Sequence, residues 1–170
     1  MGSPYLIDPS PASLARALDG WQWLSLTGKQ PLLVTAFADV FFTAADGIWL
    51  LDTLEGELKH LFGTQAELEQ ALKTEEMEDT YLMTPLIDHL LGMGMVASDT
   101  RCYDYKLHPR LGGQINHENI ELRDLVVALH MRGQLHEQVR HLKPGTRITE
   151  VKLEGAAPKP QATKPWWKRW

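Results

Sequence analysis

Cysteine, long apolar runs and basic charge are all scarce in this sequence, and each scarcity excludes a class of protein. The 170 residues include one cysteine, Cys102, which excludes an internal disulfide framework and fits a reducing compartment. No apolar run reaches the roughly 18–20 residues that a membrane-spanning helix requires. Residues 1–5 have neither the basic nor the apolar region of a signal peptide. We therefore expect a cytoplasmic protein.

Basic residues are outnumbered, with 17 Lys and Arg against 22 Asp and Glu and a formal net charge of −5. A protein that works mainly by binding nucleic acid needs a basic surface, so that class is disfavoured. The charge is also uneven, because residues 155–170 hold four basic and no acidic residues. Residues 1–154 thus carry 13 basic and 22 acidic residues, a net −9. We expect a single globular domain over 1–154 and a flexible basic tail, rich in Pro and Trp, over 155–170.

The first half of the chain has the signals of a helix followed by an antiparallel meander. Ser10-Pro11 suits a helix start, with serine as the N-cap and proline at the first helical position. β-Branched and aromatic residues are frequent over 32–42, which favours a strand there. Asp46-Gly47 and Glu55-Gly56 predict two tight turns. The three strands of the meander are expected at 32–42, 48–52 and 57–61.

The second half is predicted to contain more helix and two further strands. Thr64 and Glu67 have the spacing of a capping box, and Thr74 can cap another helix. Pro85 is expected to break that helix, and residues 98–119 are expected to form a loop. The helices are predicted over 11–24, 65–92 and 134–142, and the later strands over 122–131 and 146–153. Together they predict the α+β class, an antiparallel sheet with a meander packed by several helices on one side.

The motifs of common enzymes are not found. His136 and His141 first suggest a zinc-protease helix, but a spacing of five residues puts them about 140° apart around a helix axis. Arg140 beside them would repel a metal. No nucleophile elbow, phosphate-binding glycine loop or paired Cys-x-x-Cys occurs. We therefore predict no catalytic, cofactor-binding or metal-binding residues.

A run of acidic residues between positions 75 and 79, at the start of a predicted helix, offers a candidate binding surface. Carboxylates at the start of a helix are favoured by the helix dipole, which accounts for them without a partner. The same charges would also attract a basic protein, and the two interpretations are compatible. Asp46, Asp52, Glu55 and Glu57 at the meander turns would extend such a surface, and Trp49 or Tyr81 would anchor a partner if exposed. The run consists of Glu75, Glu76, Glu78 and Asp79.

Several stretches resemble a known family in residue type and order. They are Phe-Ala-Asp-Val-Phe at 37–41, Gly-Ile-Trp-Leu-Leu-Asp-Thr-Leu-Glu-Gly at 47–56, Leu-Gly-Gly at 111–113 with Asn-Ile-Glu at 119–121, Gly-Gln-Leu-His-Glu-Gln-Val at 133–139 and Pro-Gly-Thr at 144–146. The family is the bacterial type VI secretion immunity proteins, in particular the domain that forms the C-terminal half of immunity proteins to secreted DNase toxins. Many members have a GAD-like domain before it, which we expect to be missing here. A second departure is Ala38, where the family pattern leads us to expect glycine.

The resemblance implies a non-enzymatic function. We expect the protein to bind and occlude a cognate secreted antibacterial toxin, of nuclease or NAD-cleaving type, in the cytoplasm and with 1:1 stoichiometry. No cofactor, nucleic acid or stable membrane association is expected. Two alternatives remain open. One is a small hydrolase that would use His108, His117, His130 and His136, and the other is a membrane-proximal regulatory adaptor that would act through the Trp-rich tail.

Overall fold

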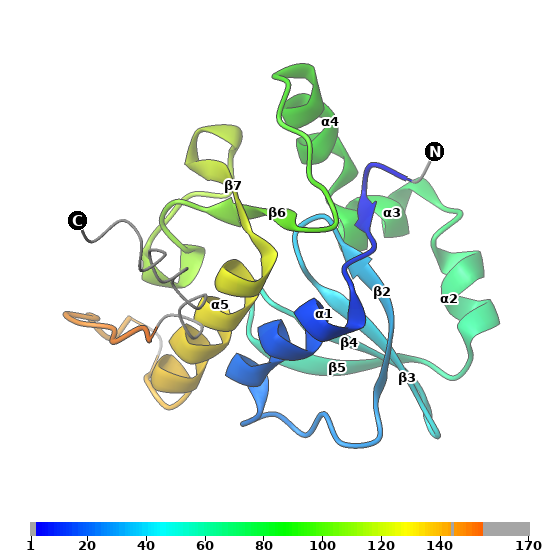
Figure 1. Cartoon of the computed structure of the whole chain (residues 1–170), viewed down its shortest axis with the longest axis horizontal. Coiled ribbons are helices and arrows are strands. Elements are labelled where there is room, and N and C mark those ends of the chain that lie inside the picture. The colour runs from blue at the N-terminus through cyan, green and yellow to red at the C-terminus, as the bar shows by residue number, and fades with distance from the viewer. Residues whose placement is uncertain (1–2, 144, 155–170) are drawn as a thin grey trace, which may run out of the picture.

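The computed structural model describes residues 3–143 and 145–154, which form two antiparallel sheets and five α-helices (Figure 1). The strands of the large sheet follow one another in sequence order, so each pairs with its neighbour in the chain. They are β1 (Leu6–Ile7), β2 (Gln30–Thr35), β3 (Val40–Ala44), β4 (Gly47–Asp52) and β5 (Glu57–Phe62). The small sheet pairs β6 (Arg101–Tyr105) with β7 (Ile120–Asp124). The predicted α+β class and the meander are confirmed.

Three of the five α-helices of the described residues begin directly after the predicted capping residues Ser10, Thr64 and Thr74. The helices are α1 (Pro11–Leu18), α2 (Gln65–Ala71), α3 (Glu75–Leu82), α4 (Thr84–Gly92) and α5 (Leu125–Val139), with short 3₁₀ turns at Asp19–Trp21, Pro109–Leu111 and His117–Asn119. Thr64 and Glu67 form the predicted capping box of α2. The predicted break before Pro85 is also present, because Met83 adopts a left-handed conformation with φ of 54° between α3 and α4. Among the helices of the described residues, none is long and apolar enough to cross a membrane.

Two neighbouring residues of β3 show how the large sheet is covered. Phe42 belongs to a core cluster with Leu14 of α1 and Leu129 of α5, whereas Phe41 packs with Leu68 of α2 on the opposite face. Adjacent side chains of a strand point to opposite faces, and both phenylalanines are fully buried. Helices therefore pack against both faces of the sheet, whereas the sequence predicted helices on one side.

The single strand predicted over 32–42 is wrong, because a tight turn at residues 36–39 divides it into β2 and β3. Thr35 Oγ1 accepts a 3.0 Å hydrogen bond from the backbone N–H of Asp39 across this turn. Ala38 has a φ of 68°, a left-handed conformation that glycine adopts more readily. A glycine, which was expected at this position, would adopt this conformation with less strain. The turn contains no glycine or proline, so its composition resembled a strand.

The predicted strand over 122–131 is wrong beyond residue 124, because the chain continues as α5. Asp124 caps this helix, its side chain accepting a 3.1 Å hydrogen bond from the N–H of Val127. Buried residues occur around much of α5, so its buried positions are not confined to one face of the helix. The short helix predicted over 134–142 is the second half of α5. The loop predicted over 98–119 is also wrong in part, since β6 lies inside it.

The strand predicted over 146–153 is wrong as well. These residues form no strand within the described part of the chain, and the backbone of Lys152 is bonded to the side chain of Gln138 of α5. The extent of the single domain predicted over 1–154 stays a prediction. The tail predicted over 155–170 lies outside the described residues.

Candidate functional site

The four carboxylates of the acidic run lie together on α3. Glu75 and Glu76 are exposed in its first turn, whereas Glu78 and Asp79 are half-buried. The helix dipole favours negative charge at this end. Within residues 3–143 and 145–154, none of the four forms an ion pair. Their negative charge is therefore not neutralised by a neighbouring cation of the described chain.

The negative charge continues from α3 to α4 through Asp88. Tyr5 Oη donates a 2.8 Å hydrogen bond to Asp88 Oδ1. This bond, together with the negative charges of Asp88, Glu78 and Asp79, raises the pKa of Tyr5 above its ordinary value. Asp79 also accepts a hydrogen bond from Thr84 Oγ1 at the start of α4. We call this region the α3 acidic surface, made of Glu75, Glu76, Glu78, Asp79 and Asp88.

Trp49 and Asp46, two further candidates, contact each other at the hairpin between β3 and β4. Trp49 Nε1 donates a 2.9 Å hydrogen bond to Asp46 Oδ1, and this bond lowers the pKa of Asp46. Lys29 Nζ lies 4.1 Å from the centroid of the Trp49 ring, and the His60 ring packs edge-on against it. Trp49 is half-buried, and its polar atom is already paired.

The remaining candidates lie on other parts of the molecule. Tyr81 packs edge-on against Phe41, on the face of the large sheet opposite to Trp49. Glu55 is exposed in the turn after β4, whereas Asp46 precedes that strand. A six-residue strand spans about 20 Å, so the two turns are well separated. The structure therefore gathers the α3 carboxylates and pairs Trp49 with Asp46, but it does not join all the candidates in one surface.

Acidic residues around the turn between β4 and β5 are partly neutralised. Lys59 Nζ lies 2.7 Å from Asp52 Oδ2 and 3.6 Å from Glu57 Oε2. Asp52 Oδ1 also accepts a 2.9 Å hydrogen bond from the backbone N–H of Glu55. This turn thus contributes less free negative charge than the α3 acidic surface.

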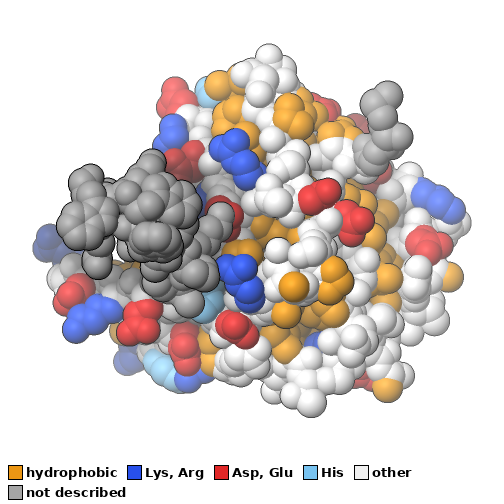
Figure 2. Space-filling view, in the orientation of Figure 1, with side chains coloured by type: hydrophobic (Ala, Val, Ile, Leu, Met, Phe, Trp, Pro, Cys, Tyr) orange, Lys and Arg blue, Asp and Glu red, His pale blue; other side chains and the backbone are white. Residues whose placement is uncertain are grey.

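An open cleft of about 940 Å³ lies between α1 and β2. Figure 2 shows hydrophobic side chains gathered over this part of the molecule. Its walls include Leu6, Leu14, Leu18, Leu26 and Phe42, and the exposed carboxylates of Asp8, Asp19 and Asp99 also line it. None of the candidates predicted from the sequence lines this cleft.

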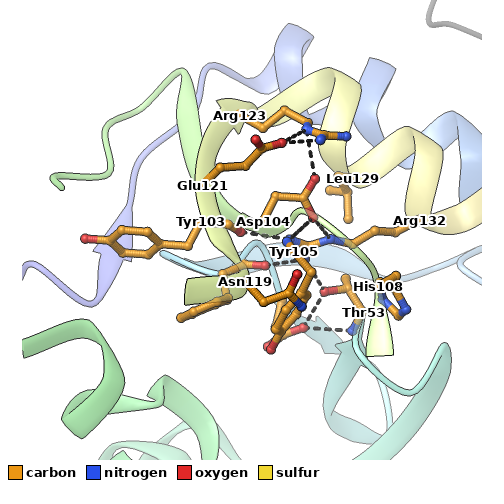
Figure 3. A network of polar contacts seen from close by, with 12 residues as sticks. Thr53, Tyr103, Asp104, Tyr105, His108, Asn119, Glu121, Arg123, Leu129 and Arg132 are labelled. Carbon is orange, nitrogen blue, oxygen red and sulfur yellow. Dashed lines mark hydrogen bonds and ion pairs between the residues drawn. The ribbon is translucent and has the colours of Figure 1, made fainter. Parts of the chain in front are cut away.

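Sequence analysis missed a buried network around Arg132 of α5 (Figure 3). Arg132 Nε donates to Asp104 Oδ1 at 3.0 Å, and one of its terminal nitrogens donates to Thr53 Oγ1 at 2.8 Å. The guanidinium also donates to the backbone oxygens of Phe37 and Tyr103. These partners come from the turn before β3, the turn after β4 and strand β6. One side chain of α5 therefore links both sheets.

Asp104 is held between two arginines. Arg132 binds its Oδ1, and Arg123 Nε lies 3.1 Å from its Oδ2, as the dashed lines of Figure 3 show. A nearby second carboxyl, that of Asp39, accepts hydrogen bonds of 2.7 Å from both the N–H and the Oγ1 of Thr53. Burial, and next the charge of Asp52, raise the pKa of Asp39 to about 6. The network thus satisfies its charges with partners from distant parts of the chain.

Two buried histidines lie beside this network. The rings of His108 and His136 are 5.1 Å apart, and His136 Nε2 is 3.1 Å from the carbonyl oxygen of Thr53. Burial lowers the pKa of His108 to about 3 and also lowers that of His136. Both rings are therefore neutral at physiological pH.

The four histidines that a hydrolase would use do not come together. His117 packs against His89 at 4.5 Å, and His130 Nε2 lies 2.9 Å from Gln134 Nε2 on α5, so neither joins His108 and His136. Across the part of the chain that the structure describes, no group of three or more His, Cys, Asp or Glu is placed to hold a metal ion. Cys102 is buried, and burial raises its thiol pKa to about 12.

Comparison with known proteins adds one finding. Residues 64–136 match the family model described as T6SS immunity protein Tdi1, C-terminal. A comparison with curated proteins gave no match. The family match begins at the N-cap of α2 and ends within α5, so it includes α3, β6 and Arg132. It confirms the resemblance to type VI secretion immunity proteins over this region, and that family implies a non-enzymatic role.

Proposed function

We propose that this protein is a type VI secretion immunity protein that binds its cognate toxin in the cytoplasm and blocks the toxin's active site. The observation that carries the proposal is the family match over residues 64–136. The α3 acidic surface lies entirely within that region. The family therefore supports the class of function, and the charge of the surface supports the class of partner.

A basic active-site cleft is the feature that an acidic inhibitor would recognise. Nucleases and NAD-cleaving enzymes bind phosphate groups, so their clefts carry positive charge. Glu75 and Glu76 are exposed and have no ion pair in the described residues, so both are available to a partner. Opposite charges accelerate association and fix the orientation of the complex. We therefore infer a toxin with a basic, phosphate-binding cleft and a 1:1 complex.

We rank the candidate contacts by their exposure and by the bonds they already make. Glu75 and Glu76 come first because they are exposed, whereas Asp79 is bonded to Thr84 and Tyr81 packs against the sheet. Trp49 lies on the other face of the sheet, so a single small interface would not include both Trp49 and Tyr81. An interface centred on α3 is the simplest arrangement.

The test is capture of the toxin with the tagged full chain, purified from its native cells. We expect one protein with a nuclease-like or NAD-cleaving domain, the toxin, to copurify near 1:1. We also expect the chain to protect cells that express this toxin. Absence of a copurifying toxin, in cells shown to express one, would contradict the proposal. So would a captured toxin that keeps its activity in the complex.

Charge reversal then tests the surface separately from the function. The double variant Glu75→Lys and Glu76→Lys should lower the association rate with the captured toxin at least about tenfold at low salt, and should weaken its salt dependence. A matched control reverses Glu118 and Glu137, which are also exposed and lie outside α3. Equal effects of the two pairs would refute the α3 acidic surface as the contact, while the immunity function would stand.

A further inference from the structure

The segment after α5 is held by two glutamines of that helix. Gln138 Oε1 accepts from the N–H of Lys152 at 3.1 Å, and its Nε2 donates to the oxygen of the same residue at 2.7 Å. Gln134 makes the same pair of bonds with the backbone of Glu154, at 2.7 and 2.9 Å. Each side-chain amide thus binds one residue of an extended chain as a neighbouring β-strand would.

The spacing of the two glutamines suits an extended peptide. Residues four apart on a helix are separated by about 6 Å along its axis. Alternate residues of an extended chain are about 6.6 Å apart. Gln134 and Gln138 therefore match residues 152 and 154 without distortion. Because they bind only backbone atoms, the two amides place no demand on the side chains of the peptide.

The residue between the two bonded positions is one of those that line a small cavity. Leu153 lines a cavity of about 160 Å³, although its own side chain remains 40% exposed. Most of the cavity lining is apolar, and most of its polar residues can donate hydrogen bonds. Its other polar walls include Tyr105, Lys106, His108, Arg123 and Arg132.

Tyr105 and His108 line this cavity, and Tyr105 Oη and His108 Nε2 are buried and form no hydrogen bond within the described chain. The backbone of Thr53 lies near the His108 ring, whereas Tyr105 Oη has no such neighbour among the groups that act on it. His108 Nδ1 accepts a 3.1 Å hydrogen bond from the N–H of Arg110, so in the neutral ring the proton lies on Nε2. Both residues are more than nine-tenths buried. Asp104 also lines the cavity, but its two oxygens are bound by Arg132 and Arg123. A buried donor without an acceptor is unfavourable, and Leu153 cannot supply one.

We propose that Gln134, Gln138 and this cavity form a binding site for an extended acidic peptide segment of a partner protein. The glutamines pair with its backbone, and a carboxylate side chain at the central position enters the cavity and accepts from Tyr105 and His108. In the free protein residues 152–154 occupy the backbone positions. The site prefers negative charge, opposite to what the α3 acidic surface prefers, and it does not depend on the proposed function.

The first experiment changes the central residue within the full chain and measures amide hydrogen exchange by NMR. In the wild type, the N–H groups of Lys152 and Glu154 should exchange more slowly than that of Leu153. Leu153→Glu should slow exchange at 152 and 154 about tenfold further, because it supplies the acceptor. Leu153→Lys should accelerate it. Faster exchange in the glutamate variant than in the wild type would overturn the proposal, because an apolar cover alone predicts that result.

A second variant identifies the donors. Tyr105→Phe removes the unpartnered hydroxyl, so it should leave amide exchange in the wild-type background almost unchanged. In the Leu153→Glu background it should remove much of the slowing of exchange at residues 152 and 154. Such a result is a coupling between the two positions. Additive effects of the two substitutions would show that the carboxylate does not meet Tyr105.

Peptides test the site in trans. The probes are acetyl-Val-Lys-Leu-Glu-amide and the same peptide with glutamate or lysine in place of leucine, titrated into the full chain. The glutamate peptide should bind at least about fivefold more tightly than the others and should release residues 152 and 154 to fast exchange. Gln134→Ala with Gln138→Ala should abolish binding, whereas Glu137→Ala on the exposed side of α5 should not. Equal affinity for the three peptides, or binding that survives the glutamine variant, would refute the proposal.

Discussion

The carboxylates of α3 and the carboxylate of Asp104 represent opposite uses of negative charge. Glu75 and Glu76 are exposed and have no ion pair among the described residues, whereas Asp104 is buried between Arg123 and Arg132. Exposed charges cost little to keep in water, so they remain available to a partner. A buried charge is costly unless it is fully paired, so the groups around it must keep their positions. The first arrangement leaves charge available to a partner, and the second fixes the positions of buried groups of the domain.

The difference appears in the number of chain segments that each region holds together. The four carboxylates of the acidic run belong to one helix, and local effects such as the helix dipole explain where they lie. The Arg132 network joins residues from both sheets and α5. Substitutions should therefore separate the two regions by their effects on stability and on binding.

Arg132→Met should produce the largest loss of stability, about 3–5 kcal/mol. It leaves Asp104 buried with one arginine fewer, and the oxygens of Thr53 and Phe37 lose the donor from which they accept. Urea unfolding followed by circular dichroism measures the free energy of unfolding. Arg110→Met is the matched control, since Arg110 is exposed, and it should change stability by less than about 0.5 kcal/mol. A loss below about 1 kcal/mol for Arg132→Met would mean that the buried network does not stabilise the fold more than the exposed carboxylates of α3 do.

Gly56→Ala should cost about 2 kcal/mol. Gly56 has a φ of 73°, and a Cβ atom there would lie 2.3 Å from the ring of His136. The substitution therefore disturbs the turn that carries Thr53 next to the network. Thermal unfolding detects the loss, and Gly28→Ala is a useful control because its φ is also positive while nothing lies within 4 Å of its Cβ position. Equal losses would show that backbone strain alone accounts for the effect.

The buried histidines should make stability depend on pH. The pKa of His108 is lowered to about 3 in the folded state, so below about pH 6.5 the unfolded chain binds a proton that the folded chain does not. Stability should therefore fall as pH decreases from 6.5 towards 3, by about 1.4 kcal/mol per pH unit for this histidine. Asp39, whose pKa is raised to about 6, acts in the opposite direction between pH 6 and its ordinary value near 4.

The variant His108→Gln separates this histidine from Asp39 and His136. It should reduce the slope of unfolding free energy against pH by about 1.4 kcal/mol per unit between pH 6 and 4, measured by urea unfolding at each pH. An unchanged slope would mean that His108 titrates normally in the folded protein, and the buried region would then tolerate charge as the surface does.

Charge reversal on α3 should have the smallest effect on stability. Glu75→Lys with Glu76→Lys opposes the helix dipole and should cost about 1 kcal/mol, measured by the same unfolding experiment. The effect on toxin association should be far larger than this cost suggests. A loss above about 3 kcal/mol would indicate that these carboxylates support the fold, and the distinction between the two regions would fail.

Local signals in the sequence predicted much of the fold. The capping box of Thr64, the turn at Asp46-Gly47 and the break at Pro85 all depend on neighbouring residues, and all three are present. The turn at 36–39 and the first half of α5 were missed because their composition favours strands while tertiary packing decides their conformation. Whether the predicted contact residues bind a toxin stays a prediction.

The Arg132 network could have been suspected from one feature of the sequence. Leu125, Leu129, Arg132, Leu135 and Val139 are spaced three or four residues apart, so a charged residue falls within an apolar stripe. Such a residue is expected to be buried and paired. The interpretation of residues 122–131 as a strand concealed this spacing. The partners of Arg132 are distant in sequence, and no local pattern identifies them.

The acceptors of Arg132 also bear on where the folding unit begins. Tyr103 and Asp104 lie inside the region that matches the immunity family, whereas Phe37 and Thr53 lie before it. A fragment cut at residue 63 would keep the arginine and lose the acceptors for one of its terminal nitrogens. The region that matches the family model therefore does not contain all the acceptors of its own buried arginine. We therefore expect the unit that folds, and that could be transplanted or fused, to include the large sheet.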